Sequence, residues 1–349
     1  MNRINKNFSE SLLNWHEVHG RKSLPWQQPQ TPYRVWLSEI MLQQTQVQTV
    51  IPYFIGFFTR FPDVYVLANA HLDEVLTLWA GLGYYSRARN LHQCAQIIVQ
   101  QFSGQFPKDP LILQSLPGIG RSTAAAIASL AFEQPTAIMD GNVKRVLSRY
   151  FLIKGTSPRD LDRQLWQQAE ACMPKTQCST YTQAIMDMGA TCCTRVRPNC
   201  EHCPLKAECL AYKHKVVDDY PPRWLRATRP IRQEQFLLFY TEDRAIYLEQ
   251  RPTKGIWGGL WCLPAIALEE CPLTHLHQHY TTSITKVESL MTLKHTFTHF
   301  QLDIYAKTIK MQENLSFPGR WVTANDRVRM ALPKPIKTII DYFLLYPKS

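Results

Sequence analysis

Four cysteines lie close together just past the middle of the chain, and they constrain the fold more than any other feature. Cys193, Cys200, Cys203 and Cys209 follow the spacing C-x6-C-x2-C-x5-C within 17 residues of a 349-residue chain. Thiolates this close in sequence can converge on one centre, either a tetrahedral zinc ion or a 4Fe–4S cluster. The neighbouring Cys192 could replace Cys193 as a ligand. The loop 193–209 is therefore a candidate metal centre.

Apart from the cysteine loop, the sequence is typical of a soluble intracellular protein. The N-terminal stretch MNRINKNFSESLLNW lacks the apolar core of a signal peptide, so we expect a cytoplasmic location and no disulfide framework. No run of about 18 apolar residues occurs, which argues against a membrane span. The net charge of +11 favours a polyanionic partner, although a basic protein without one fits the charge equally well.

The chain is long enough for two domains, and its patterning changes once. Residues 1–213 carry apolar residues at helical spacing in most segments, including a long run over 31–58, which predicts an all-α domain. Residues 214–233 are rich in proline and charge, as a linker would be. From 234 onward, alternating runs predict strands, with a hairpin around 241–244 and a helix over 333–346. The second domain, 234–349, is therefore a smaller α+β unit.

Two glycines precede a helix in the stretch LPGIGRSTA, residues 116–124. A short helix over 110–116, a turn at Gly118 and Gly120, and a second helix from Ser122 would form a helical hairpin. Main-chain N–H groups at the start of the second helix could bind a phosphate. An ordinary helix–helix turn fits the same residues.

Two carboxylates stand out from their surroundings. Glu39 lies within the apolar run VWLSEIML, so it faces either solvent, which the segment alone slightly favours, or a pocket that raises its pKa. Asp140 precedes a helix in MDGNVKRV, where it would cap that helix through main-chain N–H groups. In GLGYYSRARN, Tyr84 is either a wedge for stacked bases or a core residue.

Taken together, several motifs give the chain a family resemblance. The stretches LPWQ (24–27), VWLSEIMLQQTQV (35–47), LWAGLGYYSRARNLH (78–92), LPGIGRSTA, MDGNVKRVLSR (139–149), QAIMDMGATCCTR (183–195), the cysteine loop, GIWGGLWCLP (255–264) and KHTFTHF (294–300) span nearly the whole sequence. With them the chain resembles the helix-hairpin-helix DNA glycosylases and, within these, the MutY-type adenine glycosylases. The resemblance implies an all-α glycosylase domain with one 4Fe–4S cluster, followed by a Nudix-like domain that helps to recognise 8-oxoguanine.

The resemblance also implies a reaction and its residues. A monomeric enzyme would remove adenine mispaired with 8-oxoguanine or guanine in double-stranded DNA of the nucleoid. Glu39 would protonate adenine N7, Asp140 would stabilise the oxocarbenium-like sugar, and Asn142 would support Asp140. The residues implied to contact DNA or bases are Trp26, Gln44, Thr45, Leu82, Tyr84, Gly118, Gly120, Ser122, Gln183, Phe297, Thr298 and His299, and the implied cluster ligands are Cys193, Cys200, Cys203 and Cys209.

Three departures refine these expectations. Ser122 stands where lyase members of the superfamily carry the lysine that forms a Schiff base, so we expect no efficient strand cleavage. Lys144 is a conceivable source of weak Schiff-base chemistry. Thr298 replaces the serine of the family's Phe-Ser-His loop, which could retune recognition of 8-oxoguanine. No glutamate-rich Nudix box follows GIWGGLWCLP, so the second domain is expected to read a base rather than hydrolyse a nucleotide.

Two other function classes compete with this one. A thymine-glycol-type glycosylase with lyase activity is disfavoured by Ser122 and by the second domain. A non-catalytic or redox-sensing iron–sulfur DNA-binding protein is disfavoured because Glu39 and Asp140 are both present.

Overall fold

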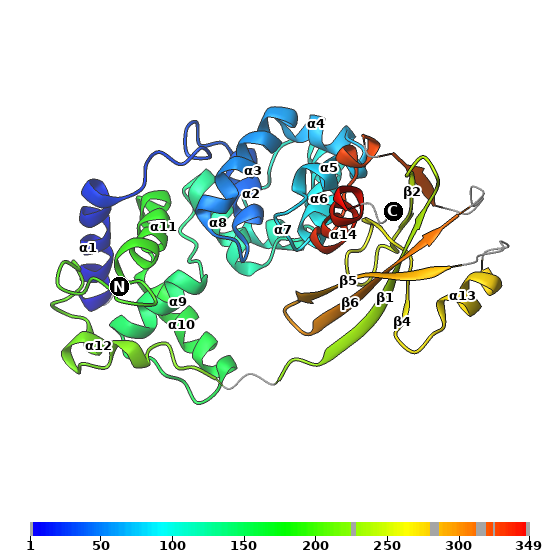
Figure 1. The fold of residues 1–349 in the computed structure, drawn as a ribbon. Helices are drawn as coiled ribbons and strands as arrows, with labels where there is room; N and C mark the ends of the chain where they lie inside the picture. The colour runs from blue at the N-terminus through cyan, green and yellow to red at the C-terminus, as the bar shows by residue number, and fades with distance from the viewer. Residues whose placement is uncertain (1–2, 225–227, 280–285, 312–318, 324, 347–349) are drawn as a thin grey trace. The chain divides into compact units, whose positions relative to one another are not determined.

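The structure is a computed structural model that describes residues 3–224, 228–279, 286–311, 319–323 and 325–346. Its contacts divide the chain into two compact units (Figure 1). Unit 1 comprises Met1–Asn69 and Asn90–Leu225, and unit 2 comprises Ala70–Arg89 and Arg226–Ser349. The segment 70–89, which the sequence places within the all-α domain, thus groups with the C-terminal part of the chain. No helix in the described part of the chain is long and apolar enough to cross a membrane.

Unit 1 is helical throughout, as the apolar spacing predicts. Its elements are α1 (Arg3–His19), α2 (Pro32–Leu42), α3 (Val47–Arg60), α4 (Val64–Asn69), most of α6 (Ser86–Phe102), α7 (Pro110–Ser115), α8 (Arg121–Phe132), α9 (Gly141–Tyr150), α10 (Pro158–Cys172), α11 (Cys178–Asp187), a π-helical turn (Met188–Cys192), α12 (Leu210–Lys213) and a 3-10 turn (Val217–Asp219). The last of these turns lies within the predicted linker 214–233.

Helices from distant parts of the chain pack together in unit 1. α2 buries Trp36, Leu37 and Ile40, and it packs against the alanine-rich helix α8. α8 in turn packs on α11, where the Ser129 and Thr182 hydroxyls lie 2.7 Å apart. α1, at the start of the chain, packs beside α11 (Figure 1). This arrangement brings residues from α2, α8, α9 and α11 into one region.

The long helical run expected over 31–58 is broken. α2 ends at Leu42, and α3 begins only at Val47. Between them Gln44 has φ of +58°, in the left-handed region that side chains rarely adopt. The four residues 43–46 therefore form a turn, and no glycine or proline marks it in the sequence.

The expected helical hairpin is present. α7 and α8 pack together, and Leu116–Gly120 connects them. Gly118 has φ of +78°, and a Cβ there would lie 2.9 Å from Cβ of Asn90. Because a side chain at position 118 would meet both strain and a clash, glycine suits this turn.

Unit 2 is an α+β fold built on one mixed sheet. Its elements are α5 (Leu72–Trp79), β1 (Ile231–Tyr240), β2 (Ile246–Gln250), β3 (Trp261–Cys262), β4 (Ala265–Ala267), α13 (Pro272–His279), β5 (Val287–Thr296), β6 (Gln301–Lys310), β7 (Arg320–Val322), a 3-10 turn (Asp326–Arg329) and α14 (Lys334–Leu345). The expected β1–β2 hairpin forms, and β1 begins three residues before the predicted domain start.

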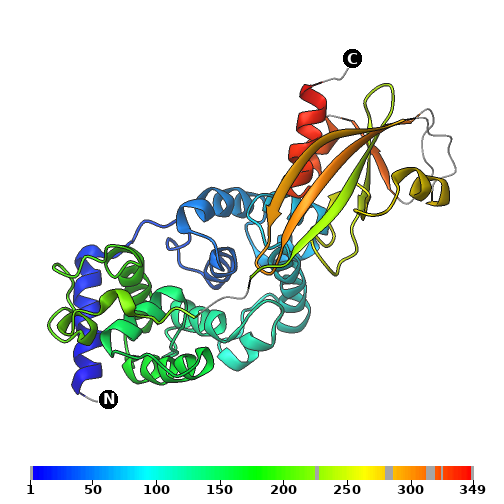
Figure 2. The same cartoon turned by 60° about the horizontal axis from the view of Figure 1, so that its bottom comes forward.

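The sheet order is β3-β2-β1-β6-β5, with β4 paired to β1 and β7 paired to β2. β1 and β6 are parallel over ten residues, whereas β5 and β6 are antiparallel. Figure 2 shows these three strands as a curved sheet, with the red helix α14 beside β5. α14 buries Ile336, Ile339 and Ile340, which closes the core on that side.

The segment 70–89 makes specific contacts within unit 2. Gln250 donates a hydrogen bond to Asp73 Oδ1 at 3.2 Å, and Arg89 donates to the main-chain oxygen of Gly258. Tyr85 reaches the main-chain oxygen of Leu332 at 3.5 Å. α5 and the following loop therefore contribute hydrogen bonds that stabilise unit 2.

Candidate active site and cysteine loop

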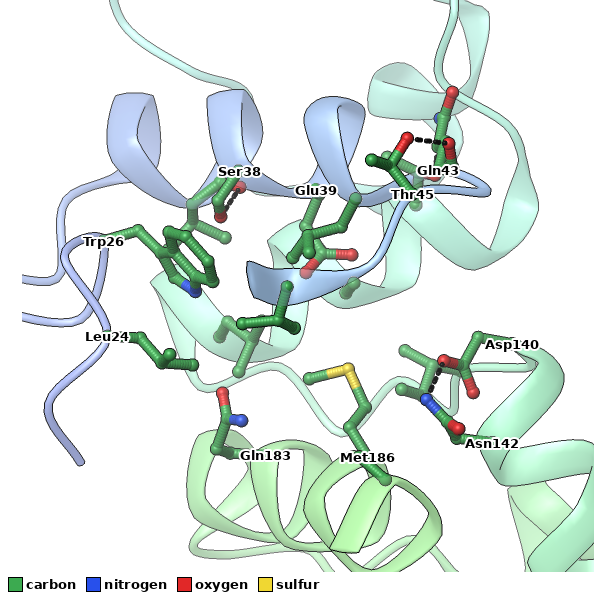
Figure 3. Close-up of a pocket in the computed structure, with 18 of the residues that line it drawn as sticks. Leu24, Trp26, Ser38, Glu39, Gln43, Thr45, Asp140, Asn142, Gln183 and Met186 are labelled. Carbon is green, nitrogen blue, oxygen red and sulfur yellow. Dashed lines mark hydrogen bonds between the residues drawn. The ribbon is translucent and has the colours of Figure 1, made fainter. Parts of the chain in front are cut away.

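One large pocket in unit 1 gathers both predicted catalytic carboxylates and several of the other residues singled out from the sequence. Its volume is about 960 Å³, and its walls come from α2, the turn 43–46, the starts of α3 and α9, α8, and α11. Eight of the expected residues line it: Trp26, Glu39, Gln44, Thr45, Ser122, Asp140, Asn142 and Gln183. Figure 3 shows Glu39 pointing from α2 into the pocket, with Asp140 and Asn142 on another wall and Gln183 rising from α11.

Glu39 lies in the wall of this pocket and not on the outer face of α2. Its neighbours in the helix, Ser38 and Ile40, are both buried. Burial, together with the smaller effect of the nearby charge of Asp140, raises the pKa of Glu39 to about 7. Part of the Glu39 population is therefore protonated at neutral pH.

Asp140 has the expected capping role at the start of α9. Its Oδ1 accepts from the main-chain N–H of Val143 at 2.7 Å, and its Oδ2 accepts from the Asn142 amide at 3.2 Å. Burial raises the pKa of Asp140, while these hydrogen bonds and the positive charge of Arg145 act to lower it. Hydrogen bonds and a positive charge thus stabilise the ionised form of Asp140. The pKa of Glu39 is set by burial and by the charge of Asp140, and neither of these favours its ionised form.

Ser122 tethers the chain just before Asp140. Its hydroxyl accepts a hydrogen bond from the main-chain N–H of Met139 at 3.0 Å. The first turn of α8 and the strand-like segment leading to Asp140 are thereby fixed to each other. Lys144, by contrast, pairs with Asp162, and it is not among the pocket-lining residues.

The turn 43–46 connects the pocket to the helical hairpin. The Gln43 amide donates to the main-chain oxygen of Gly118 at 3.3 Å and to the Thr123 hydroxyl at 3.2 Å. Gly120 is the N-cap of α8, with no side-chain cap, so the first N–H groups of that helix are left for another partner. Gly118 and Gly120 lie on the hairpin and do not line the pocket.

Five of the expected residues lie in unit 2. Leu82 is buried, and Tyr84 is 47% exposed with φ of +49°. The Tyr84 hydroxyl lies 3.3 Å from that of Thr298, which is exposed, as is His299. Within unit 2, Tyr84 and Thr298 are therefore neighbours, although 214 residues separate them in sequence.

Phe297 anchors the loop that carries Thr298 and His299. Its ring stacks on Phe300 at 4.6 Å and lies 5.5 Å from the ring of Trp257. The Phe297 N–H also donates to the main-chain oxygen of Phe300 at 2.9 Å, which closes the turn. Because Trp257 is itself buried, this aromatic cluster fixes the base of the loop.

The four cysteines of the loop 193–209 line one small pocket. Cys192, Arg149, Asn199, Lys206, Tyr212 and Val217 also line it. In the described part of the chain, no three His, Cys, Asp or Glu side chains are close enough to hold one metal ion. The thiols thus share a cavity without the spacing of a single-ion site, where every sulfur lies about 2.3 Å from the ion.

Sequence reasoning missed two arginines of α9 that hold this loop, one of which also contacts a residue of the pocket. Arg145 donates to the main-chain oxygen of Cys193 at 2.7 Å and to the Asn142 side chain at 2.9 Å. Arg149 is buried and donates to Cys193 Sγ at 3.4 Å and to the Thr194 main-chain oxygen at 2.7 Å. Their spacing in KRVLSR, four residues apart on one helix face, was the available signal.

Sequence reasoning also missed Arg21 and Asp187. Asp187 is fully buried at the end of α11, and Arg21 lines the pocket while pairing with it at 2.6 Å. The two residues are 166 positions apart, so no local pattern connects them.

Comparisons with known proteins agree with this architecture. Residues 37–171 match the HhH-GPD superfamily of base excision DNA repair proteins, and residues 235–342 match the NUDIX domain. The chain is 37% identical to an adenine DNA glycosylase of Buchnera aphidicola from Schizaphis graminum, over 96% of this chain and 98% of that one. It is 33% identical to an adenine DNA glycosylase of Homo sapiens, over 96% of this chain and 74% of that one.

Solved structures give the same result for the helical part. A thermostable thymine-DNA glycosylase aligns with a TM-score of 0.56 and 27% identity, over 61% of this chain and 98% of that one. Endonuclease III in a non-covalent DNA complex aligns with a TM-score of 0.53 over 62% of this chain and 99% of that one; at 20% identity this likeness concerns the fold alone. The predicted fold class, a helical glycosylase domain with a smaller Nudix-like α+β domain, is confirmed.

Proposed function

The chain belongs to the adenine DNA glycosylases, base-excision-repair enzymes that remove adenine, and we propose that it removes adenine paired with 8-oxoguanine or guanine. In this proposal the adenine swings out of the duplex into the pocket lined by Glu39, Asp140 and Gln183. Hydrolysis there leaves an abasic site.

Glu39 acts as the general acid. An N-glycosidic bond breaks more easily when the departing base takes up a proton, because the base then leaves as a neutral molecule. A carboxyl with a pKa of about 7 can donate that proton at neutral pH, whereas an ordinary glutamate would already be ionised. This raised pKa, in a pocket shared with Asp140, is the single observation that carries the proposal.

Asp140 stabilises the positive charge that develops on the sugar. Two donors at the start of α9 fix its orientation before the substrate arrives. A charge that is already in place costs no reorganisation during the reaction. Asn142 acts indirectly, since its amide holds Asp140 while its oxygen accepts from Arg145.

We infer that the loop 193–209 holds one 4Fe–4S cluster through its four cysteines. The four thiols line one cavity, and their C-x6-C-x2-C-x5-C spacing belongs to the motifs that carry the family resemblance, which supports a 4Fe–4S centre. When bound, the cluster would cross-link the loop and so keep Cys193 against Arg145 and Arg149.

Several residues are proposed to contact DNA outside the pocket. The hairpin at Gly118 and Gly120 presents free N–H groups of α8 to a phosphate. Gln44 and Tyr84 would fill the stack, and Thr45, Leu82 and the loop at Thr298 would lie near 8-oxoguanine. Gln44 lines the pocket, and the Tyr84 side chain is exposed, so both are placed where they can contact a substrate.

The test is single-turnover release of adenine from duplexes that carry adenine opposite 8-oxoguanine, guanine, cytosine or thymine. We expect fast release opposite 8-oxoguanine and no release by Glu39→Gln. Glu10→Gln is the matched control, because Glu10 is an exposed residue of α1 that pairs with Lys6. A duplex with thymine glycol and a borohydride trap test the lyase alternative. If DNA binds but no duplex releases adenine, the catalytic assignment is wrong.

A further inference from the structure

Asp187 lies behind the pocket wall, at the end of α11, and is fully buried. Its Oδ1 accepts from Arg21 Nε at 2.8 Å and from Arg21 Nη2 at 2.6 Å. Its Oδ2 accepts from the Arg21 main-chain N–H at 2.7 Å and lies 3.5 Å from His16 Nε2. Burial alone would raise the pKa of Asp187, but His16 and Arg21 lower it overall. The buried group is therefore a carboxylate, which only accepts hydrogen bonds.

The same carboxylate reaches a residue that faces the substrate. Gln183 lies one turn earlier on α11, and its Nε2 donates to Asp187 Oδ1 at 2.8 Å. An amide has a donor end and an acceptor end, and only the donor end can face a carboxylate. The Gln183 oxygen must then turn away from Asp187. Figure 3 shows the Gln183 side chain rising from α11 into the pocket with its oxygen outermost.

We propose that Asp187 is a specificity-positioning residue: it locks the amide of Gln183 so that the pocket presents a hydrogen-bond acceptor to the extruded base. An acceptor at that place suits a purine with an exocyclic amine, as in adenine. It disfavours a purine with a carbonyl at the same position, because two acceptors would face each other without a proton. This inference rests on the proposed use of the pocket for the extruded base.

The hydrogen bond that orients Gln183 can be changed while Gln183 itself is kept. In Asp187→Asn, either orientation of the new amide sets its NH2 group against a donor of Arg21, the guanidinium on the Oδ1 side or the main-chain N–H on the Oδ2 side. Where the NH2 group takes the Oδ1 side, it also faces Gln183. The Gln183 amide is then free to turn over and present its own NH2 group to the pocket. The acceptor for the adenine amine is lost in part of the population, and a donor for a carbonyl is gained.

The experiment compares three duplexes that differ only in the target base: adenine, hypoxanthine with a carbonyl in place of the amine, and unsubstituted purine. Single-turnover rates are measured for the iron-loaded full-length protein. For Asp187→Asn we expect the adenine-to-purine rate ratio to fall by several-fold and at most about tenfold relative to the unmodified protein, because one full hydrogen bond is lost only where the Gln183 amide has turned over. The hypoxanthine-to-purine ratio should rise. If all three rates fall by the same factor, Asp187 only supports the fold and the proposal is overturned.

A second variant keeps the test decisive if Asp187→Asn does not fold. Gln183→Leu removes the amide and leaves the contacts between Asp187 and Arg21 in place. It should lower the adenine-to-purine ratio about tenfold, at least as far as Asp187→Asn does, and adding Asp187→Asn to it should change the ratio no further. An unchanged ratio in Gln183→Leu also overturns the proposal.

Asp162→Asn is the matched control, because this half-exposed carboxylate pairs with Lys144 and does not line the pocket. It should leave all the ratios unaltered. Different outcomes test the proposed function and the role of Asp187. Absence of adenine release by the unmodified protein would refute the proposed function, whereas active variants with unaltered ratios refute only the role of Asp187.

Discussion

Gly189 and Asn142 pack so closely that a Cβ on Gly189 would lie 2.5 Å from Cβ of Asn142. Gly189 belongs to the π-helical turn that follows α11, and Asn142 lies in the first turn of α9. The side chain of Asn142 holds Asp140. The size of residue 189 therefore controls where the proposed sugar-stabilising carboxylate lies.

Gly189→Ala should push Asn142 and the start of α9 away, since main-chain atoms of Asn142 lie within 3.0 Å of the new methyl group. We expect adenine release to slow at least tenfold and stability to fall by roughly 1–3 kcal/mol. Single-turnover rates and thermal melting check this.

Gly56→Ala is the control, because Gly56 is exposed within α3 and a Cβ there would have open space around it. It should leave the rate alone and stabilise the protein by roughly 0.5–1 kcal/mol. A Gly189→Ala enzyme with the unmodified rate would refute this link.

The rate of adenine release should fall as pH rises through about 7. The general acid must be protonated, and Glu39 loses its proton around that pH. Asp140 must be ionised, so protonation should lower the rate on the acid side and give a bell-shaped profile. Single-turnover rates between pH 5 and pH 9 measure it. A rate that stays constant from pH 6 to pH 9 would exclude Glu39 as the proton donor.

Glu39 should also make folding depend on pH. Its pKa rises from 4.5 to about 7 on folding, so the fold favours the protonated form. This stabilisation is complete below about pH 4.5 and is lost as pH rises through about 7, a change of at most roughly 3 kcal/mol. Glu39→Gln lacks this dependence and should gain stability relative to the unmodified protein between pH 5 and pH 8. Denaturant unfolding at pH 5 and pH 8 measures the difference in unfolding free energy between the two proteins. A lower stability of Glu39→Gln at these pH values would contradict the burial of Glu39.

Arg149→Met should destabilise the cysteine loop. Buried Arg149 donates to the main-chain oxygens of Thr194, Val217 and Tyr220 and to Cys193 Sγ. Without these donors, partly buried carbonyls lose their partners, and we expect a loss of unfolding free energy of roughly 1–3 kcal/mol. Iron should also be released faster to a chelator. Arg163→Met, which removes an exposed arginine paired with Asp160, should change neither quantity. Equal iron retention in both variants would show that Arg149 does not hold the loop.

Thr298→Ala should weaken the preference for 8-oxoguanine opposite adenine. Thr298 is exposed and its hydroxyl contacts that of Tyr84, so its loss should cost little stability. We expect release from the 8-oxoguanine pair to slow more than release from the guanine pair, with Thr298→Ser restoring the difference. Rates on the two duplexes measure this. Equal slowing on both would place recognition elsewhere.

Local patterns predicted the elements of this fold well. The hairpin at Gly118, the β1–β2 turn and the terminal helix α14 each have turn residues or periodic apolar residues in the sequence. The break at 43–46 had no such signal, because Gln44 adopts a left-handed backbone without being a glycine. That strain is supported by contacts that the sequence does not display, such as the bond from Gln43 to Gly118.

The site was predictable in part. Asp140 could be placed because a helix cap is a local feature. The side on which Glu39 lies could not be settled from its segment, since apolar residues surround it on every face of α2. The pairing of Arg21 with Asp187 depends on tertiary folding across 166 residues, and only the structure shows it.

The grouping of residues 70–89 with the C-terminal part has a consequence for anyone who shortens this gene. A stop codon in the region 214–233 would remove Gln250, Gly258 and Leu332 but keep Asp73, Tyr85 and Arg89, which bond to them. The shortened protein would not be an intact catalytic half. Its loop with Leu82 and Tyr84 would lack the rest of the unit to which it belongs. Impaired repair in such a truncation would therefore reflect a disturbed loop 80–85 as well as the loss of residues 234–349.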